Sequence, residues 1–459
     1  MAHPWQGMIV WAAMNLSWWV VLPFVLMLAV IAVAPLIPGV RDLWERLGAK
    51  LVVALILGVP TAAAVWIWLA PDLVLSTLRE YVEFIALIAS LFVVCGGFFL
   101  AGNLRATPRN NAILLGIGGV LASFIGTTGA AMVMIRPLLA ANRERENKVH
   151  TVIFAIFIIA NCGGLLTPLG DPPLYIGLLR GVPFTWTFTL TPQWLFINGL
   201  LLLTYVGLDR QFYAKESTTS VAQDRQNATR VNLHGRFNIV WLLVIIASVA
   251  FLGDFIWIKV GVQIGAAAAS YIITNRKTRF EDNGFTWGPI LEVAVLFLGI
   301  FLTMIPALAY LRSVADQLPL NEYTFFTFTG ALSSVLDNAP TYLTFFEMGT
   351  QMPGAALVAG VPSLYLTAIS LGAVTCGAIT YIGNGPNFMV KAIAEERGIT
   401  MPSFGRYVVW ACEYLVPILV AMVCLFLSPN LWVKLIGAAI ALILVARSIT
   451  QIVRTHTRA

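Results

Sequence analysis

The sequence predicts an all-α polytopic membrane protein with inverted structural repeats. Of its 459 residues 59% are hydrophobic, and mean hydropathy is +0.84. Only 11% of the residues are charged, against about 25% in a soluble domain. The apolar segments are about 20 residues long, which suits membrane helices and is too long for the alternating strands of a β-barrel. We expect about 11 transmembrane helices, two re-entrant hairpins and two broken helices.

Residues 1–208 form the first expected repeat, with apolar spans, one hairpin and one broken helix. The stretch 111–140 is too long for one span, and the Gly-rich sequence SFIGTTGAA lies at its middle. We interpret it as a hairpin with its tip at residues 126–129. The expected spans are 17–39, 50–70, 81–102 and 190–208, with the broken helix at 151–180.

The segment NCGGLLTPLGDPP, residues 161–173, interrupts an apolar run. Three glycines, three prolines and Asp171 cannot continue an ordinary helix. Non-helical backbone is tolerated at membrane depth only where it is buried in protein or lines a polar cavity. A carboxylate there costs about 2.5–3.5 kcal/mol on insertion scales. A transported ion is the leading candidate to offset that cost.

A polar stretch, 209–236, is the expected cytoplasmic linker, and residues 237–427 form the second repeat. Its hairpin is expected at 323–348, with SSVLDNAPT at the middle, and its broken helix at 362–395, with GAITYIGNGPN at the break. Residues 428–459 hold a C-terminal helix and tail. The expected spans are 237–253, 255–274, 287–310, 406–427 and 430–447, with a tight turn at Gly253-Asp254.

The distribution of basic residues orients the chain. With the N-terminus outside and the C-terminus in the cytoplasm, all but five of the 28 Lys and Arg residues fall in cytoplasmic loops or at their edges. The exceptions are Arg79, Arg180, Lys259, Arg312 and Lys434. The sequence therefore predicts a multi-pass protein of the inner (plasma) membrane. The net charge of +6 follows from the same rule, so nucleic acid is not an expected partner.

The two halves match at a nearly constant offset. Glu83 matches Glu292 at 209 residues, Gly126-Thr127 matches Asp337-Asn338 at 211, and Gly170-Asp171 matches Gly383-Asn384 at 213. Five spans per repeat is an odd number, so the second copy is inverted in the membrane. Inverted repeats with broken helices are typical of secondary transporters, whose binding site lies near the bilayer midplane.

The four interruptions supply oxygen ligands of the kind that hard cations prefer. Asp171 and Asp337 add one carboxylate per half and are candidate Na⁺ ligands. Desolvation disfavours the ionised form of a carboxyl, so such a group can hold a proton or a cation, which is a physical basis for exchange. The neutral candidates for the ion or substrate site are Thr127, Thr128, Asn161, Thr167, Asn338, Thr380, Asn384 and Asn387.

Structural roles are open for several of these residues. Asp171 and Asp337 each precede a half-helix and suit an N-cap. Thr167 and Thr380 suit hydrogen bonds to freed backbone carbonyls. Glu83 and Glu292 lie near the expected starts of their helices, where an acidic residue suits the dipole. Glu413 suits either a proton relay or an anchor at the membrane interface, and Arg136 and Glu347 suit the interface.

Cofactor and enzyme chemistry have little support in the sequence. All four histidines are expected in loops or tails, and no pair has metal-ligand spacing. The five cysteines lie in apolar segments and are interpreted as small apolar residues. No Ser/His, His/Glu or Gly-Asp-type catalytic pair occurs in the spans. We expect neither an enzyme nor a resident cofactor.

The motif Asn161-x-Gly163-Gly164-x-x-Thr167-Pro168-x-Gly170-Asp171 resembles that of NhaD-type sodium/proton antiporters of the ion transporter superfamily. That superfamily also contains arsenite permeases and carriers of citrate and divalent anions. The resemblance implies hairpins and broken helices that move elevator-fashion against a scaffold, in a homodimer. The chain departs from the antiporter pattern at Pro172-Pro173 and at 383–387.

The expected function is Na⁺ (or Li⁺)/H⁺ antiport by alternating access, with Na⁺ and H⁺ as the transported ions. The alternative is a Na⁺- or H⁺-coupled carrier of a citrate-like carboxylate or an arsenite-like anion. No arginine lies at any break, and Asp337 would repel an anion, so electrostatics favour a cation.

Overall fold

The computed structural model describes residues 17–37, 39–230, 232–253 and 255–456. Within these ranges α-helices dominate, and six helices are long and apolar enough to cross a membrane. Four shorter apolar helices accompany them. The expected class, an all-α polytopic membrane protein, is confirmed. Asp254, in the expected turn, and the N-terminal residues 1–16 lie outside the described residues.

The first half contains ten helices among its described residues. A short 3₁₀ turn, Trp18–Val21, precedes the first of them. The hairpin 108–141 consists of two helices that meet at Gly126, whose φ of +79° only glycine adopts readily. The helices are α2 (Leu22–Val33), α3 (Arg41–Trp44), α4 (Leu47–Trp68), α5 (Pro71–Cys95), α6 (Pro108–Ile125), α7 (Thr127–Ala141), α8 (Val149–Ile158), α9 (Pro172–Leu179), α10 (Thr191–Tyr213) and α11 (Thr218–Asn227).

The second half also contains a hairpin followed by a broken helix, with further helices before and after them. The second hairpin begins with a capping box at Asn321. The Asn321 side chain accepts a hydrogen bond from the Thr324 backbone N–H, and the Thr324 hydroxyl accepts one from the Asn321 backbone N–H. The helices are α12 (Asn238–Phe251), α13 (Ile256–Ile273), α14 (Gly288–Val314), α15 (Glu322–Ser333), α16 (Asn338–Gly349), α17 (Ser363–Cys376), α18 (Gly385–Glu396), α19 (Phe404–Tyr414), α20 (Val416–Met422) and α21 (Leu431–His456).

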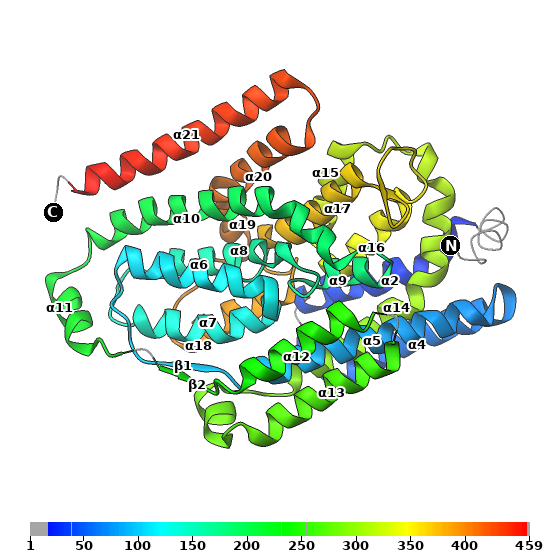
Figure 1. Cartoon of the computed structure of the whole chain (residues 1–459), viewed down its shortest axis with the longest axis horizontal. Helices are drawn as coiled ribbons and strands as arrows, with labels where there is room; N and C mark the ends of the chain where they lie inside the picture. The colour runs from blue at the N-terminus through cyan, green and yellow to red at the C-terminus, as the bar shows by residue number, and fades with distance from the viewer. Residues whose placement is uncertain (1–16, 38, 231, 254, 457–459) are drawn as a thin grey trace.

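The helices form two packed groups (Figure 1). In one group, which we call the scaffold group, α14 packs against α2, α4 and α5, and α13 packs against α5 and α12. In the other, the core group, the hairpin α6–α7 contacts α8, α10 and α18, and the hairpin α15–α16 contacts α9 and α17. Helix α21 lies along α10 at the edge of the molecule.

Two ion pairs connect the halves within the scaffold group. Lys259 on α13 binds Glu83 on α5 at 2.6 Å, and Lys50 on α4 binds Glu292 on α14. Lys50 and Lys259 are 209 residues apart, as are Glu83 and Glu292, so the second pair repeats the first with the halves exchanged. The expectation that Glu83 lies near a helix start is wrong. Helix α5 begins at Pro71, so Glu83 is about three turns inside it and is neutralised by Lys259.

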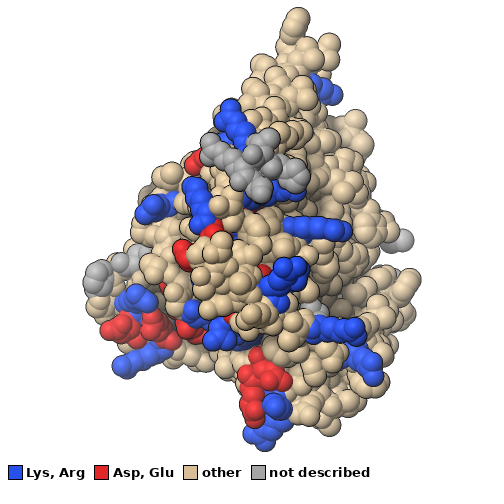
Figure 2. All heavy atoms as spheres, turned by 90° about the vertical axis from the view of Figure 1, so that its left-hand side faces the viewer, with Lys and Arg blue, Asp and Glu red and all other residues tan. Residues whose placement is uncertain are grey.

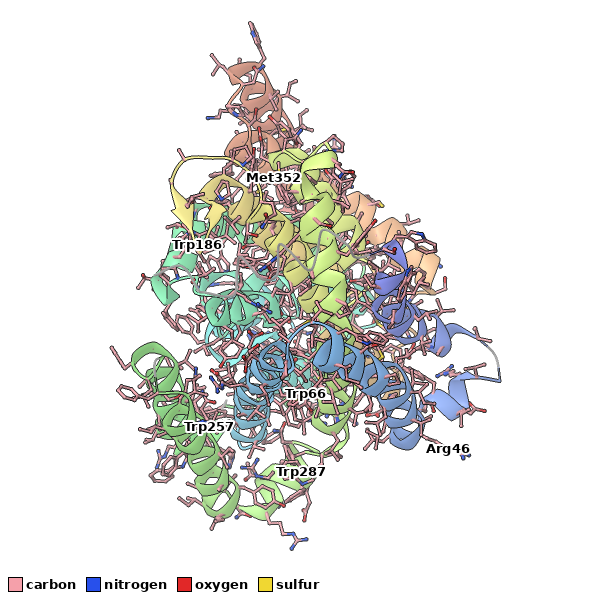
Figure 3. The ribbon with its side chains drawn as sticks, turned by 90° about the vertical axis from the view of Figure 1, so that its right-hand side faces the viewer. Arg46, Trp66, Trp186, Trp257, Trp287 and Met352 are labelled. Carbon is pink, nitrogen blue, oxygen red and sulfur yellow. The ribbon has the colours of Figure 1, made fainter. Side chains whose placement is uncertain are left out.

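Large aromatic side chains mark the exposed faces of the scaffold group. Figure 3 locates Trp66 on α4 and Trp257 on α13, at the end of the molecule where α4 finishes and α13 begins. Their exposed fractions are 45% and 65%. Amphipathic rings at helix ends are typical of the membrane–water interface.

The expected linker is more structured than a polar connection. Helix α10 continues to Tyr213, five residues beyond the expected end of its span, and α11 follows. Strand β2 (Asn232–His234) pairs antiparallel with β1 (Phe99–Ala101), and β3 (Leu357–Val358) pairs with β4 (Val361–Pro362). Asp224 on α11 accepts two bonds from the Ala106 backbone N–H, each 3.1 Å long. The linker is therefore attached to the start of the first hairpin.

The last helix is longer than the sequence predicted. Helix α21 extends nine residues beyond the expected limit at 447, and its Arg447 binds Glu413 at the exposed surface, which favours the anchor role for Glu413.

Cys95, Cys162 and Cys376 are buried free thiols, Cys424 is half-buried and Cys412 is exposed. Cys95, at the end of α5, packs tightly against Gly129 of α7.

Candidate functional site

The two broken helices have the same backbone geometry. In the first, a 3₁₀ turn (Cys162–Leu166) separates α8 from α9, and in the second a 3₁₀ turn (Gly377–Ile379) separates α17 from α18. Asp171 has φ −149° and ψ 145°, and Asn384 has φ −152° and ψ 136°. Asp171 and Asn384 are 213 residues apart. Each residue immediately precedes the second half-helix of its break.

Glycine pairs hold each break in its compact form. A Cβ atom on Gly170 would lie 2.0 Å from the carbonyl oxygen of Gly164, and one on Gly383 would lie 2.6 Å from that of Gly377. No side chain fits at either distance, because real Cβ contacts are longer. In each break two stretches of backbone therefore pack so closely that only glycine fits at Gly170 and at Gly383.

Thr167 and Thr380 attach the breaks to the hairpins. The Thr167 hydroxyl donates to the Ser123 carbonyl and accepts from the Leu169 N–H. Its counterpart, the Thr380 hydroxyl, donates to the Ser334 carbonyl and accepts from the Ile382 N–H. Both hydroxyls are thus engaged with backbone, which is the structural role that the sequence left open.

Asp171 joins three elements from both halves of the chain. Its Oδ1 accepts a 2.7 Å hydrogen bond from the Thr127 hydroxyl at the start of α7. Its Oδ2 accepts from the Asn338 amide at the start of α16. Asp171 is 1% exposed and its side chain does not cap α9. The carboxylate therefore points to the tips of both hairpins.

One oxygen beside Asp171 has no partner. Asn338 is fully buried, its amide nitrogen is used by Asp171, and its Oδ1 receives no hydrogen bond. An unsatisfied buried acceptor costs about 1–3 kcal/mol. A cation coordinated by this oxygen and by the Asp171 carboxylate would satisfy both, since hard cations bind oxygen ligands.

A chain of three buried amides links the two breaks. Asn384 donates to the Ala160 carbonyl and to Asn161 Oδ1, both at 3.1 Å. Asn161 donates to Asn387 Oδ1 at 2.7 Å, and Asn387 donates to the carbonyls of Gly377 and Thr380. These bonds make the three asparagines part of the frame that surrounds Asp171.

Asp337 and Thr128 differ from the other expected site residues. Asp337 Oδ1 accepts from the Ala339 N–H at 3.0 Å, so this side chain caps α16, and it is half-buried. Thr128 is half-buried, and no hydrogen bond of its side chain joins it to the other candidates.

The charge around the site is negative. Among the described residues, neither Asp171 nor its partners Thr127 and Asn338 form a bond with a lysine or arginine. The described part of the chain also lacks any group of three His, Cys, Asp or Glu side chains suited to a transition metal. The oxygen groups here are one carboxylate, an amide oxygen and a hydroxyl, which are the ligand types that hard cations prefer.

A buried charged cluster near the C-terminal end of α10 was missed from the sequence. His150, expected in a loop, is in α8, and its Nε2 lies 2.7 Å from Asp209 Oδ1. Arg145 binds the same carboxylate at 2.6 Å and Glu216 at 3.6 Å. The expected end of the span at Leu208 concealed the cluster, because it placed Asp209 and Glu216 in the linker.

A second charged cluster, half-buried except for Glu347, connects the core group to the scaffold group. Arg180, at the end of α9, binds Glu80 of α5 at 3.0 Å and Glu347 of α16 at 3.3 Å. Arg312 of α14 binds the same Glu347. The Glu347 side chain is 1% exposed and bridges Arg180 and Arg312. Arg136, its counterpart at the 211 offset, bonds the Asn283 backbone carbonyl.

Comparison with known proteins gives the family. A protein-family model described as "putative citrate transport" matches residues 13–427. An uncharacterized transporter of Mycobacterium bovis is 28% identical over 317 residues, which is 65% of this chain and 72% of that protein. An uncharacterized transporter of Mycobacterium tuberculosis matches with the same values. Together with the apolar helices, the matching model shows that the chain is a multi-pass membrane protein and belongs to this family of transporters.

Proposed function

We propose that the protein is a secondary transporter that binds Na⁺ or Li⁺ at Asp171 and exchanges it for H⁺. The observation that carries the proposal is the geometry at the hairpin tips. Asp171 is buried between Thr127 and Asn338, and the Asn338 Oδ1 beside it lacks a partner. A cation at this position gains a full carboxylate charge and a buried amide oxygen. Binding of a proton to Asp171 removes the charge, so the two ions compete.

The proposal includes inverted repeats and alternating access. Its support is the recurrence of the same bonds at the same offsets. The pairs Lys259–Glu83 and Lys50–Glu292 repeat at 209 residues, and the Thr167 and Thr380 bonds repeat at 213. In this mechanism the core group carries the ion and slides against the scaffold group, elevator-fashion, within a homodimer.

The proposed orientation places the N-terminus outside and the C-terminus in the cytoplasm of the inner membrane. Figure 2 shows the end of the molecule that carries α11 and the C-terminal end of α21, and many Lys and Arg side chains gather there. Basic residues collect on the cytoplasmic side of membrane proteins. This end is therefore the proposed cytoplasmic face.

A second candidate is a Na⁺- or H⁺-coupled carrier of a small carboxylate of the citrate class. The description of the matching family favours it. The start of α7 and the start of α16 meet at Asp171, and helix N-termini attract anions through their free N–H groups. In this case a cation at Asp171 neutralises the carboxylate and makes the site acceptable to an anion.

Proteoliposomes loaded with a pH-sensitive dye separate the two functions. We expect pulses of Na⁺ and Li⁺, but not K⁺, to drive proton movement in wild-type vesicles and none in vesicles with Asp171→Asn. Uptake of labelled citrate is measured in parallel. Citrate uptake with no dye response to Na⁺ alone supports the second candidate and overturns antiport. If the Asp171→Asn variant exchanges ions at the wild-type rate, the assignment of the ion site to Asp171 is overturned for both candidate functions.

A further inference from the structure

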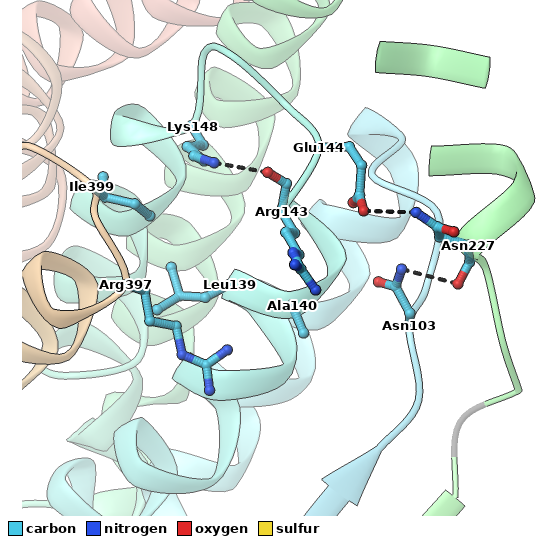
Figure 4. A pocket seen from close by; sticks show the side chains of 9 residues that line it. All are labelled: Asn103, Leu139, Ala140, Arg143, Glu144, Lys148, Asn227, Arg397 and Ile399. Carbon is cyan, nitrogen blue, oxygen red and sulfur yellow. Dashed lines mark hydrogen bonds between the residues drawn. The ribbon is translucent and has the colours of Figure 1, made fainter. Parts of the chain in front are cut away.

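A cavity at the proposed cytoplasmic face is separate from the Asp171 site. Its volume is about 620 Å³, and it lies where the end of α7, the loop that follows, the end of α18 and the linker come together (Figure 4). Leu139 and Ile399 form apolar parts of its wall. The polar side chains that line it are Asn103, Arg143, Glu144, Lys148, Asn227 and Arg397.

The lining holds three cations and one carboxylate. Glu144 is directed to the linker, where its Oε1 accepts from Asn227 at 2.9 Å. Lys148 donates to the Arg143 backbone carbonyl at 2.9 Å. Burial lowers the pKa of Lys148, an effect that the charges of Glu144 and Glu216 oppose. In the described part of the chain no acidic group forms an ion pair with Arg143 or Arg397.

The convergence of these cations is more specific than a general excess of basic residues. Arg143 follows the first hairpin, Arg397 directly follows α18, and Lys148 precedes α8. Two segments distant in the sequence therefore direct like charges toward one concave space: the loop between α7 and α8, with Arg143 and Lys148, and the residue after α18, Arg397. Like charges in a shared cavity repel one another, and an anion bound between them attracts each of them and offsets that repulsion. Guanidinium groups bind phosphate and carboxylate oxygens in pairs, which gives both strength and geometry.

We propose that this cavity is a binding site for a multivalent oxyanion, held between Arg143 and Arg397 with Lys148 as a third charge. Phosphate and carboxylate groups share the required chemistry, and the source is either a soluble anion of the cytoplasm or the headgroup of an anionic phospholipid. Because Asn227 belongs to the linker and Arg397 to the core group, a bound anion connects the two. The site is independent of the Asp171 assignment, and its binding test requires no transport.

The test uses the full-length purified chain and inorganic pyrophosphate as the soluble probe. In nanodiscs of zwitterionic lipid, we expect pyrophosphate to raise the melting temperature saturably beyond KCl of equal ionic strength. The double variant Arg143→Gln/Arg397→Gln should weaken apparent affinity at least tenfold. The matched control is Arg225→Gln/Arg230→Gln, which removes two exposed cations of the linker outside the cavity and should bind as wild type.

A second arm identifies the source of the anion. Nanodiscs with anionic phospholipid are compared with zwitterionic ones, without pyrophosphate. Stabilisation by the anionic lipid that the double variant loses and the control keeps supports the site, with a headgroup as ligand. The proposal is overturned if neither probe stabilises the protein, or if the double variant responds as strongly as wild type. If the wild-type protein shows no Na⁺/H⁺ exchange but binds pyrophosphate as expected, the proposed antiport is overturned and the anion site is supported.

Discussion

The two broken helices have nearly the same backbone and very different side-chain chemistry. In both, a glycine packs on a carbonyl oxygen and a threonine hydroxyl bonds the neighbouring hairpin. At the position before the second half-helix, however, the first break has Asp171, which contacts both hairpin tips. The second has Asn384, which bonds the opposite break. The comparison teaches that the backbone shared by the two breaks builds the frame, while only the first break places a buried carboxylate at the hairpin tips.

Moving the carboxylate between the breaks is the strongest way to test this difference. The exchange Asp171→Asn/Asn384→Asp keeps the net charge, but it places the new carboxylate against the Ala160 carbonyl and Asn161 Oδ1, which are both acceptors. We expect Na⁺-driven proton flux to fall to the rate of protein-free liposomes. Asp337→Asn is the matched control, since asparagine also caps helices, and it should keep measurable flux. Active transport by the exchanged variant contradicts the comparison.

The repeated ion pairs of the scaffold group should differ in their contribution to stability. The side chains of Lys259 and Glu83 are 5% and 6% exposed, whereas Glu292 of the other pair is 46% exposed. Glu83→Gln leaves a buried lysine without a partner and should cost about 3–5 kcal/mol. Glu292→Gln also removes the partner of a buried lysine, because the Lys50 side chain is 7% exposed, but it should cost less than Glu83→Gln, since the Glu292 carboxylate is half-exposed. Thermal unfolding of both variants in one detergent measures the difference, and equal losses would show that burial does not separate the pairs.

Asn387→Ala tests whether the second break is mainly structural. The substitution removes the bonds to the Gly377 and Thr380 carbonyls and to Asn161, all in a fully buried position. Loss of such bonds should cost about 1–3 kcal/mol of stability. We expect a lower melting temperature and little change in the half-saturating Na⁺ concentration of the protein that remains folded. A large change in Na⁺ affinity at unchanged stability would instead assign Asn387 to the ion site.

The hairpin tips should affect Na⁺ affinity to a smaller extent. Asn338→Ala removes the amide that bonds Asp171 and the unpartnered oxygen beside it. Thr127→Ala removes the other bond to the carboxylate. Each should raise the half-saturating Na⁺ concentration about tenfold, the effect of losing about 1.4 kcal/mol. Thr128→Ala is the control on the same helix turn and should resemble wild type. If neither variant changes the half-saturating Na⁺ concentration, the hairpin tips are not part of the ion site.

The sequence was informative where backbone chemistry is local. The positions of both breaks follow from glycine and proline, and Asp171 stands out because an ionised group rarely enters an apolar run. The roles of Thr167 and Thr380 needed the structure, because a hydroxyl that bonds the Ser123 or Ser334 carbonyl has the same local sequence as one that faces an ion.

Features that depend on distant contacts were not predictable in this way. The expected span began at residue 81, yet α5 begins at Pro71 and includes Glu80 and Glu83, which Arg180 and Lys259 neutralise from other segments. His150 likewise needed Asp209, 59 residues away, to be buried. Partners of this kind are fixed by packing between helices, which no local pattern contains.

The thiol of Cys95 gives the protein a natural reporter of movement. It belongs to α5 of the scaffold group and packs against Gly129 of the first hairpin, whereas Cys376 packs against Gly330 within the core group. If the core group slides, the contact at Cys95 opens and the contact at Cys376 stays closed. Alkylation of Cys95 should therefore accelerate during turnover in a protein whose exposed Cys412 has been replaced. No cysteine has to be introduced to follow the motion.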